Sequence, residues 1–388
     1  MRNKRWLKIL LITVSHILVA AIAVSAALLL QPDKTTKLDK IQSIIDTKYI
    51  GDFDQKVLDD AAAAAMVDAL PDQWSYYISA EQYASHMEQK KNAYVGIGIT
   101  IRAREDGTGL DVLLVEPGGP AQEGGVLPGD ILTHAEGQPV TELGVEGAAA
   151  LIKGQEGTKV RVTFLRNGEV LELELERRTI QVTVAEWQML EGNIGYIKIN
   201  NFNTNCADQS IQAVTELIDR GATALIFDVR NNPGGYVDEL VKLLDHLLPE
   251  GPLFRSVDYR GLEDVEKSDK NCVPVPMAVL MNGNSYSAAE FFAAALEEYN
   301  WAFTAGDPTT GKSYYQVTYR LDDGSAVNIS IGEYTTPNGR SLADEGGLVP
   351  NLPVPVDDQT AANIYAGILE PAEDPQIQAV VAALLENP

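Results

Sequence analysis

The chain has 388 residues, of which 45% are hydrophobic and 22% charged, a composition typical of a globular protein with two or three domains. Its 55 acidic residues outnumber 30 Lys and Arg, giving a formal net charge of −25. Such a surface repels phosphate backbones and argues against nucleic-acid binding. The two cysteines, Cys206 and Cys272, form no CxxC motif, which excludes a zinc site built on cysteines and leaves one disulfide open.

The first thirty residues indicate the compartment. Residues 1–8 form a basic tail, and residues 9–30 are mostly apolar and long enough to cross a hydrocarbon layer of about 30 Å. The positive-inside rule predicts a cytoplasmic tail and an extracytoplasmic chain beyond the span. A cleaved signal peptide, with residues 23–26 as its cleavage site, is the alternative. We favour a transmembrane anchor because the apolar run continues through Leu30, and either reading predicts an extracytoplasmic protein.

Residues 31–91 are predicted to form a helical arm. Leu38, Ile41 and Ile44 recur at helical spacing, and an alanine run at 61–65 precedes Pro71, which is typical of helices. A further helix is expected near residues 80–89. The sequence leaves open whether this arm packs within its own chain or joins a homodimer.

Residues 92–178 are predicted to form a compact β-rich module. Glycine and apolar residues alternate over 96–101, and Asn167-Gly168 indicates a hairpin between two strands. From 179 to 388, apolar strands alternate with amphipathic helices, and two short helices close the chain. That alternation favours an α/β domain with a largely parallel sheet, in which sites form where strands give way to helices.

Two such junctions stand out. Residues 228–235 read DVRNNPGG, and the paired glycines at a helix start would let backbone N–H groups face an anion, as an oxyanion hole requires. A tight turn explains the same residues. Residues 281–290 read MNGNSYSAAE. One of Ser285 and Ser287 is expected to cap the helix, and the other is a candidate nucleophile that needs a base.

The base is the open question at this stage. Of the histidines, only His246 falls within the α/β part, whereas His16 lies in the apolar segment and His86 and His134 lie in other modules. A Ser-His-Asp triad would therefore need His246, in the middle of a leucine-rich helix. Lys312 is the alternative, because a lysine in an apolar site can lose its proton near neutral pH; a solvated turn lysine is the competing interpretation.

Residues 306–313 also match the phosphate-binding pattern GxxxxGK[ST]. That motif must open a helix. Here alternating residues flank the turn at 322–324, which predicts a β-hairpin, so we reject a nucleotide site.

Taken together, the motifs resemble one family, the carboxyl-terminal processing peptidases, which are tail-specific serine proteases of the S41 type. Each motif alone is weak, but their order and spacing match. The resemblance rests on residues 70–77 (LPDQWSYY), 96–99 (GIGI), 228–235, 285–290, 310–316 (TGKSYYQ) and 334–340 (YTTPNGR).

This resemblance implies an α/β protease core, a mixed sheet with flanking helices, into which a PDZ domain is inserted. It implies Ser287 as nucleophile and Lys312 as general base, with Gln316 orienting the base. The N–H groups of Gly235 and Ala288 would form the oxyanion hole. The PDZ carboxylate-binding loop would comprise Gly96, Ile97, Gly98 and Ile99.

The sequence departs from the family pattern at Tyr286, where a small residue is usual, and at Thr310 and Ser313, where an aromatic residue and a glycine are common. None of these changes removes a catalytic group. No metal or organic cofactor is implied.

We therefore expect a membrane-anchored, extracytoplasmic serine endopeptidase that recognises protein or peptide substrates by their free C-termini. The alternative is a PDZ-containing peptide-binding protein with an inactive protease core. The presence of Ser287, Lys312 and Gln316 counts against that alternative.

Overall fold

The computed structural model describes residues 13, 14, 16, 36–104 and 106–386. Among them, no helix has the length and apolar character needed to cross a membrane. The predicted anchor at 9–30 lies outside the described residues except for positions 13, 14 and 16. The chain divides into two compact units, one ending at Ala62 and the other comprising Ala63–Pro388.

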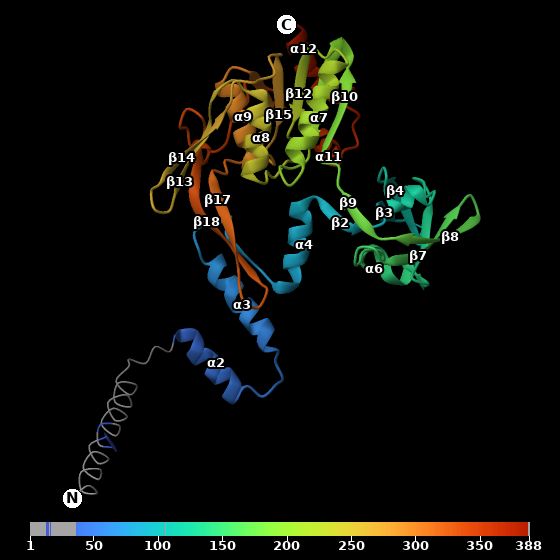
Figure 1. The fold of residues 1–388 in the computed structure, drawn as a ribbon, viewed down its shortest axis with the longest axis vertical. Coiled ribbons are helices and arrows are strands. Elements are labelled where there is room, and N and C mark those ends of the chain that lie inside the picture. Colours follow the sequence, from blue (N-terminus) through green and yellow to red (C-terminus); the bar gives the residue numbers. More distant parts are fainter. Residues whose placement is uncertain (1–12, 15, 17–35, 105, 387–388) are drawn as a thin grey trace, which may run out of the picture. The chain divides into compact units, whose positions relative to one another are not determined.

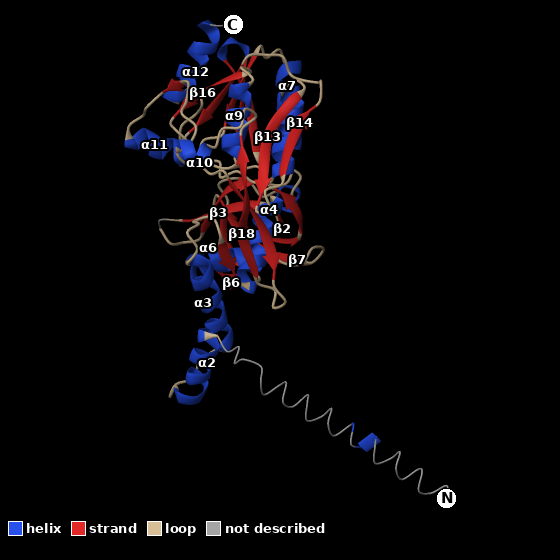
Figure 2. Ribbon diagram, turned by 90° about the vertical axis from the view of Figure 1, so that its left-hand side faces the viewer, coloured by secondary structure: helices blue, strands red, loops and turns tan. Residues whose placement is uncertain are grey.

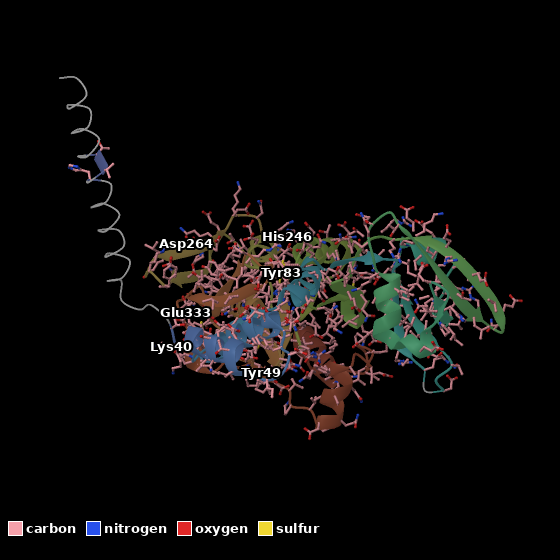
Figure 3. The ribbon with its side chains drawn as sticks, turned by 90° about the horizontal axis from the view of Figure 1, so that it is seen from below. Lys40, Tyr49, Tyr83, His246, Asp264 and Glu333 are labelled. Carbon is pink, nitrogen blue, oxygen red and sulfur yellow. The ribbon has the colours of Figure 1, made fainter. Side chains whose placement is uncertain are left out.

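The first unit contains the helix α2 (Lys37–Lys48) and the start of α3 (Gln55–Asp68). Thr36 begins α2 with a capping box, in which its hydroxyl and the Asp39 carboxylate each accept a backbone N–H of the other residue. No residue of α2 is buried, and the labelled Lys40 and the adjoining Tyr49 are both exposed (Figure 3). The predicted helices of this segment are confirmed.

The predicted β-rich module is a sheet with two helices, α5 (Pro120–Glu123) and α6 (Val140–Ile152). Its hairpin at Asn167-Gly168 joins β7 to β8 as predicted. An antiparallel ribbon of β2 (Ala93–Gly96) and β9 (Arg178–Gln181) pairs the two ends of the module. The sheet has the strand order β3 (Ile99–Ala103), β4 (Leu110–Val115), β5 (Ile131–Ala135), β7 (Lys159–Arg166) and β8 (Glu169–Glu176), with β6 (Gln138–Pro139) beside β5.

The α/β part is built on a six-stranded sheet. All neighbours are parallel except β10 and β11, which confirms the predicted, largely parallel sheet. The strand order is β10 (Ala185–Leu190), β11 (Ile194–Ile199), β12 (Ala224–Asp228), β15 (Met277–Met281), β16 (Ala302–Gly306) and β19 (Leu352–Pro353).

Helices cover both faces of this sheet (Figure 1). The helices are α7 (Cys206–Asp219), α8 (Val237–Leu247) and α9 (Ala288–Glu298) on one face and α12 (Pro375–Glu386) on the other, with α11 (Asp358–Tyr365) before α12. Because side chains alternate along a strand, neighbouring residues enter different cores. Phe227 packs in the core that includes residues of α7, α8 and α9, whereas Ile226 packs in the core that includes residues of α12.

A second, smaller sheet was predicted only in part, as the β-hairpin around residues 322–324 that forms β17 and β18. It has the order β1 (Tyr76–Ile78), β18 (Ala326–Thr335), β13 (Gly251–Asp258) and β14 (Glu263–Ser268), with β17 (Tyr314–Arg320) also paired to β18. Figure 2 shows β13 and β14 as a long antiparallel ribbon. The helix α4 (Ala80–Lys91) follows β1, and the short helix α10 (Leu342–Glu345) follows β18.

The two cysteines do not pair in this fold. Cys206 is buried at the start of α7 and Cys272 is half-buried, and both thiols are free.

Candidate active site

The loop after β12 approaches the start of α9 closely. Gly234 has a φ of 81°, and a Cβ added to it would lie 2.8 Å from the Ala288 nitrogen and 2.9 Å from the Ser287 Cβ. The side chain of Asn232 fixes this loop: it accepts the Gly234 N–H (2.8 Å) and donates to the Ile199 carbonyl (2.8 Å). Only glycine fits at residue 234 without displacing the serine beside it.

The two serines of the 281–290 segment have different surroundings. Ser285 is fully buried and its hydroxyl donates to the Val229 carbonyl at 2.7 Å, so it ties the two junctions together. Ser287 is the N-cap of α9 and has φ 59° and ψ −126°, a region that residues other than glycine rarely adopt. Its backbone N–H is held by the Glu290 carboxylate at 2.9 Å. Ser287, unlike Ser285, lines a cavity.

This cavity, of about 360 Å³, brings the predicted catalytic residues together. It is lined by Gly235, Ser287, Ala288, Lys312 and Gln316. No hydrogen bond among the described residues uses the N–H of Gly235 or Ala288, so both donors remain free for a ligand.

Lys312 lies just before the strand β17. The ammonium is 4.6 Å from the ring centroid of Trp74 and 5.8 Å from that of Tyr286. Burial, reinforced by the charge of Lys90, lowers the pKa of Lys312 to about 8. Because a strand and not a helix follows, the phosphate-loop motif is excluded by the fold, as predicted.

The candidate nucleophile and base are not hydrogen-bonded to each other. Among the described residues, no hydrogen bond joins the Ser287 hydroxyl to the Lys312 ammonium. The Gln316 amide donates instead to the Tyr314 carbonyl (2.8 Å) and the Ser330 hydroxyl (3.0 Å). The roles predicted for these residues therefore remain predictions.

Glu290 was not identified as a site residue from the sequence. Its carboxylate is fully buried and accepts the backbone N–H groups of Gly311 (2.6 Å) and Lys312 (2.8 Å) and the Thr309 hydroxyl (2.5 Å). With its bond to the Ser287 N–H, it joins the segments that carry the candidate nucleophile and the candidate base. The spacing S-x-x-E from Ser287 to Glu290 is a capping-box signal that could have identified it.

The assignment of His86 to a separate module was wrong. His86 and Lys90 of α4 both line the same cavity as Ser287, because the end of α4 is bonded to the core: the Lys90 carbonyl accepts the N–H of Thr204 at 3.3 Å. His246 is half-buried on α8 (Figure 3) and does not line the cavity.

The predicted carboxylate-binding loop of the β-rich module lies beside a groove. Three of its residues, Ile97, Gly98 and Ile99, line a groove of about 250 Å³ together with Ile152 of α6. The fourth, Gly96, does not line it and belongs to β2, where it pairs with Arg178.

Comparison with known proteins identifies the family. A model of peptidase family S41 matches residues 193–354, and a PDZ model matches residues 112–166. The chain is 32% identical over 318 residues to the carboxy-terminal processing protease CtpA of Bacillus subtilis (strain 168), covering 81% of this chain and 67% of that protein. This chain belongs to the C-terminal processing peptidases of family S41.

This S41 peptidase is also similar to two further proteins. It is 27% identical over 377 residues to a probable CtpA-like serine protease of Staphylococcus aureus (strain N315), covering 93% of this chain and 75% of that protein. A solved photosystem II D1 C-terminal processing protease superposes with a TM-score of 0.47 at 26% identity, covering 82% of this chain and 87% of the other.

Proposed function

We propose that this peptidase hydrolyses peptide bonds with Ser287 as nucleophile and Lys312 as general base. The observation that carries the proposal is the single cavity that contains Ser287, the free N–H groups of Gly235 and Ala288, and a lysine whose pKa is about 8. A lysine with that pKa is partly neutral near physiological pH and is able to accept a proton.

In the proposed mechanism, the Ser287 hydroxyl attacks the scissile carbonyl while Lys312 takes its proton. The N–H groups of Gly235 and Ala288 stabilise the negative charge that develops on the carbonyl oxygen. Lys312 then gives the proton to the leaving amine, and water hydrolyses the acyl-enzyme by the same steps. Because Lys312 packs on Trp74, the ammonium must turn toward Ser287 before the first step, and Gln316 would orient it there.

The PDZ groove supports recognition of substrate C-termini. Neither N–H of Ile97 and Gly98 is used in the hydrogen bonds of the described residues, so both could bind a carboxylate while the peptide adds as a strand beside β3. Amidating the C-terminus of a long substrate should therefore slow its cleavage. Equal rates for the acid and the amide would exclude this role.

We further propose that residues 9–30 anchor the peptidase in the membrane and place it outside the cytoplasm. Amino-terminal sequencing of the membrane fraction tests the anchor, since a mature start at Ala27 would exclude it.

We also propose that the exposed apolar residues of α2 form the contact of a homodimer. These residues are Leu38, Ile41 and Ile44, which are 44–61% exposed on one helix. Sedimentation of a variant with all three residues changed to serine tests the dimer.

The decisive experiment labels the protein with a fluorophosphonate, which reacts with activated serines. We expect labelling and peptide cleavage in the native protein, neither in Ser287→Ala, and strong loss of both in Lys312→Ala. Gln316→Ala should lose less, because it would only orient the base. Circular dichroism verifies folding. A folded native protein that binds peptides but neither labels nor cleaves would instead support the inactive peptide-binding alternative.

A further inference from the structure

A second lysine lies in the catalytic cavity. Lys90, near the end of α4, lines it together with Ser287 and Gly235. Its ammonium is 5.7 Å from the ring centroid of Tyr236, the residue that follows Gly235. The Lys90 carbonyl accepts both the N–H (3.3 Å) and the hydroxyl (3.2 Å) of Thr204, so the backbone that carries this side chain is fixed to the core.

Within the part of the chain that the structure describes, the charge of Lys90 has no carboxylate partner. Among the described residues, no ion pair includes Lys90, although acidic residues outnumber basic ones by 55 to 30 in the whole chain. The one carboxylate that lines the cavity, Asp238, is exposed and forms no ion pair with it.

Two further basic groups, His86 and Lys312, line the same cavity. His86 lies one turn earlier on α4. Lys312 is close enough for the charge of Lys90 to lower its pKa, and burial lowers the pKa of Lys90 itself. A half-buried cation without a counter-charge is unfavourable, and an anion bound beside it removes that cost.

We infer that Lys90 is a specificity residue that binds a carboxylate of the substrate next to the scissile bond. The preferred substrates carry there either an acidic side chain or their own terminal α-carboxylate. The ammonium lies over Tyr236, adjacent to the proposed oxyanion donor Gly235, so a peptide positioned over Ser287 brings its flanking groups within its reach. This inference rests on the proposed function, because the substrate must occupy the site of Ser287.

Two series of matched peptides test it. The first places Glu or Gln at single positions flanking the cleaved bond, with the terminus unchanged, so that any effect of the PDZ domain cancels. The second compares the free acid with the amide in short peptides that end two residues after the bond. The ratio of kcat/KM between the charged and the neutral peptide is measured for each pair.

We expect the native peptidase to favour the charged member of at least one series by about ten-fold, which corresponds to about 1.4 kcal/mol. In Lys90→Met that ratio should fall to about one, and in Lys90→Arg, which keeps the charge, it should persist. Lys91→Met is the matched control: Lys91 is exposed next in sequence, so the net charge changes equally and the preference should remain. The series that responds identifies the source of the carboxylate.

Ratios are required because removing the charge of Lys90 also raises the pKa of Lys312, which slows every peptide alike at neutral pH. Equal rates for charged and neutral peptides in the native protein would overturn the inference, as would a preference that survives in folded Lys90→Met. If that variant does not fold, Lys90→Gln takes its place. Absence of both cleavage and fluorophosphonate labelling would instead refute the proposed function.

Discussion

Gly234 and Ser287 constrain each other at the scale of single residues. The serine has a positive φ, and the glycine lies against it with no room for a methyl group. This contact also sets the position of the next N–H, that of Gly235, which is a proposed oxyanion donor.

We predict that Gly234→Ala lowers kcat by about a hundred-fold or more, because the loop must shift and loss of one oxyanion donor has an effect of that size. Gly221→Ala is the control. Gly221 also has a positive φ, 91°, but no atom lies within 4 Å of an added Cβ, so both variants carry a backbone penalty of about 1–2 kcal/mol and only Gly234→Ala carries the clash. Steady-state cleavage measures kcat and urea unfolding measures the stability of each variant. An equal loss of kcat in Gly234→Ala and Gly221→Ala would contradict the proposed effect of the clash.

The pH dependence of cleavage tests Lys312. Its pKa is lowered to about 8, so the proton that blocks catalysis is bound below that pH and lost above it. Cleavage should therefore rise with pH through a midpoint near 8, and Lys312→Arg should be as inactive as Lys312→Ala because arginine keeps its proton. A midpoint at or below ~6.5, or an active Lys312→Ala, would point to a histidine such as His86, whose pKa is lowered by burial and by the charge of Lys90.

At the scale of elements, Glu290 connects helix α9 to the turn that enters β17. We predict that Glu290→Gln lowers kcat about a hundred-fold. The amide keeps one acceptor oxygen in place of two, so its NH2 group must face either the Gly311 N–H or the N–H groups of Lys312 and Ser287, and the segment left without an acceptor moves. The free energy of unfolding should fall by about 1–3 kcal/mol.

Glu297→Gln is the matched control for this variant. Glu297, on the same helix, accepts the Thr304 hydroxyl at 2.6 Å but does not line the catalytic cavity. It should lose stability and keep its turnover. A Glu290→Gln protein with normal kcat would show that the carboxylate does not position the site.

The sequence alone could predict some of these elements and site residues but not others. Strand-to-helix junctions are local features, and the residues at 228–235 and 281–290 could be identified because glycine, proline and serine have strong local preferences. The position of Lys90 in the cavity and the packing of Trp74 on Lys312 could not, since both depend on tertiary contacts with residues far along the chain. The strand β1 has only three residues, and β14 (EDVEKS) lacks a regular apolar alternation, so neither carries a strand signal.

At the scale of the whole molecule, a buried ion network joins the segment around Asp374 to the loop after β12, which carries the proposed oxyanion donor Gly235. Arg230, just after β12, pairs with Asp228 (2.6 Å) and Asp374 (2.8 Å), all with side chains no more than 4% exposed. Gln376 accepts a further hydrogen bond from Arg230 at 2.8 Å.

We predict that Asp374→Asn lowers the free energy of unfolding by about 3 kcal/mol, because a buried cation loses one of its two counter-charges. Denaturant unfolding followed by circular dichroism measures the change. Asp344→Asn, which alters an exposed aspartate on α10, should change stability little. Equal effects of the two substitutions would contradict a special role for the network.

The order of synthesis determines when these long-range contacts are able to form. Trp74, which packs on Lys312, is tied by its carbonyl to Asn328, 254 positions later, and the Arg230 network closes 146 positions after the arginine. A ribosome adds residues from the amino terminus at about 5–20 per second, so Ser287 emerges well before the groups that complete its surroundings. A nascent chain therefore completes the surroundings of Ser287 only after Asn328 and Gln376 have been added.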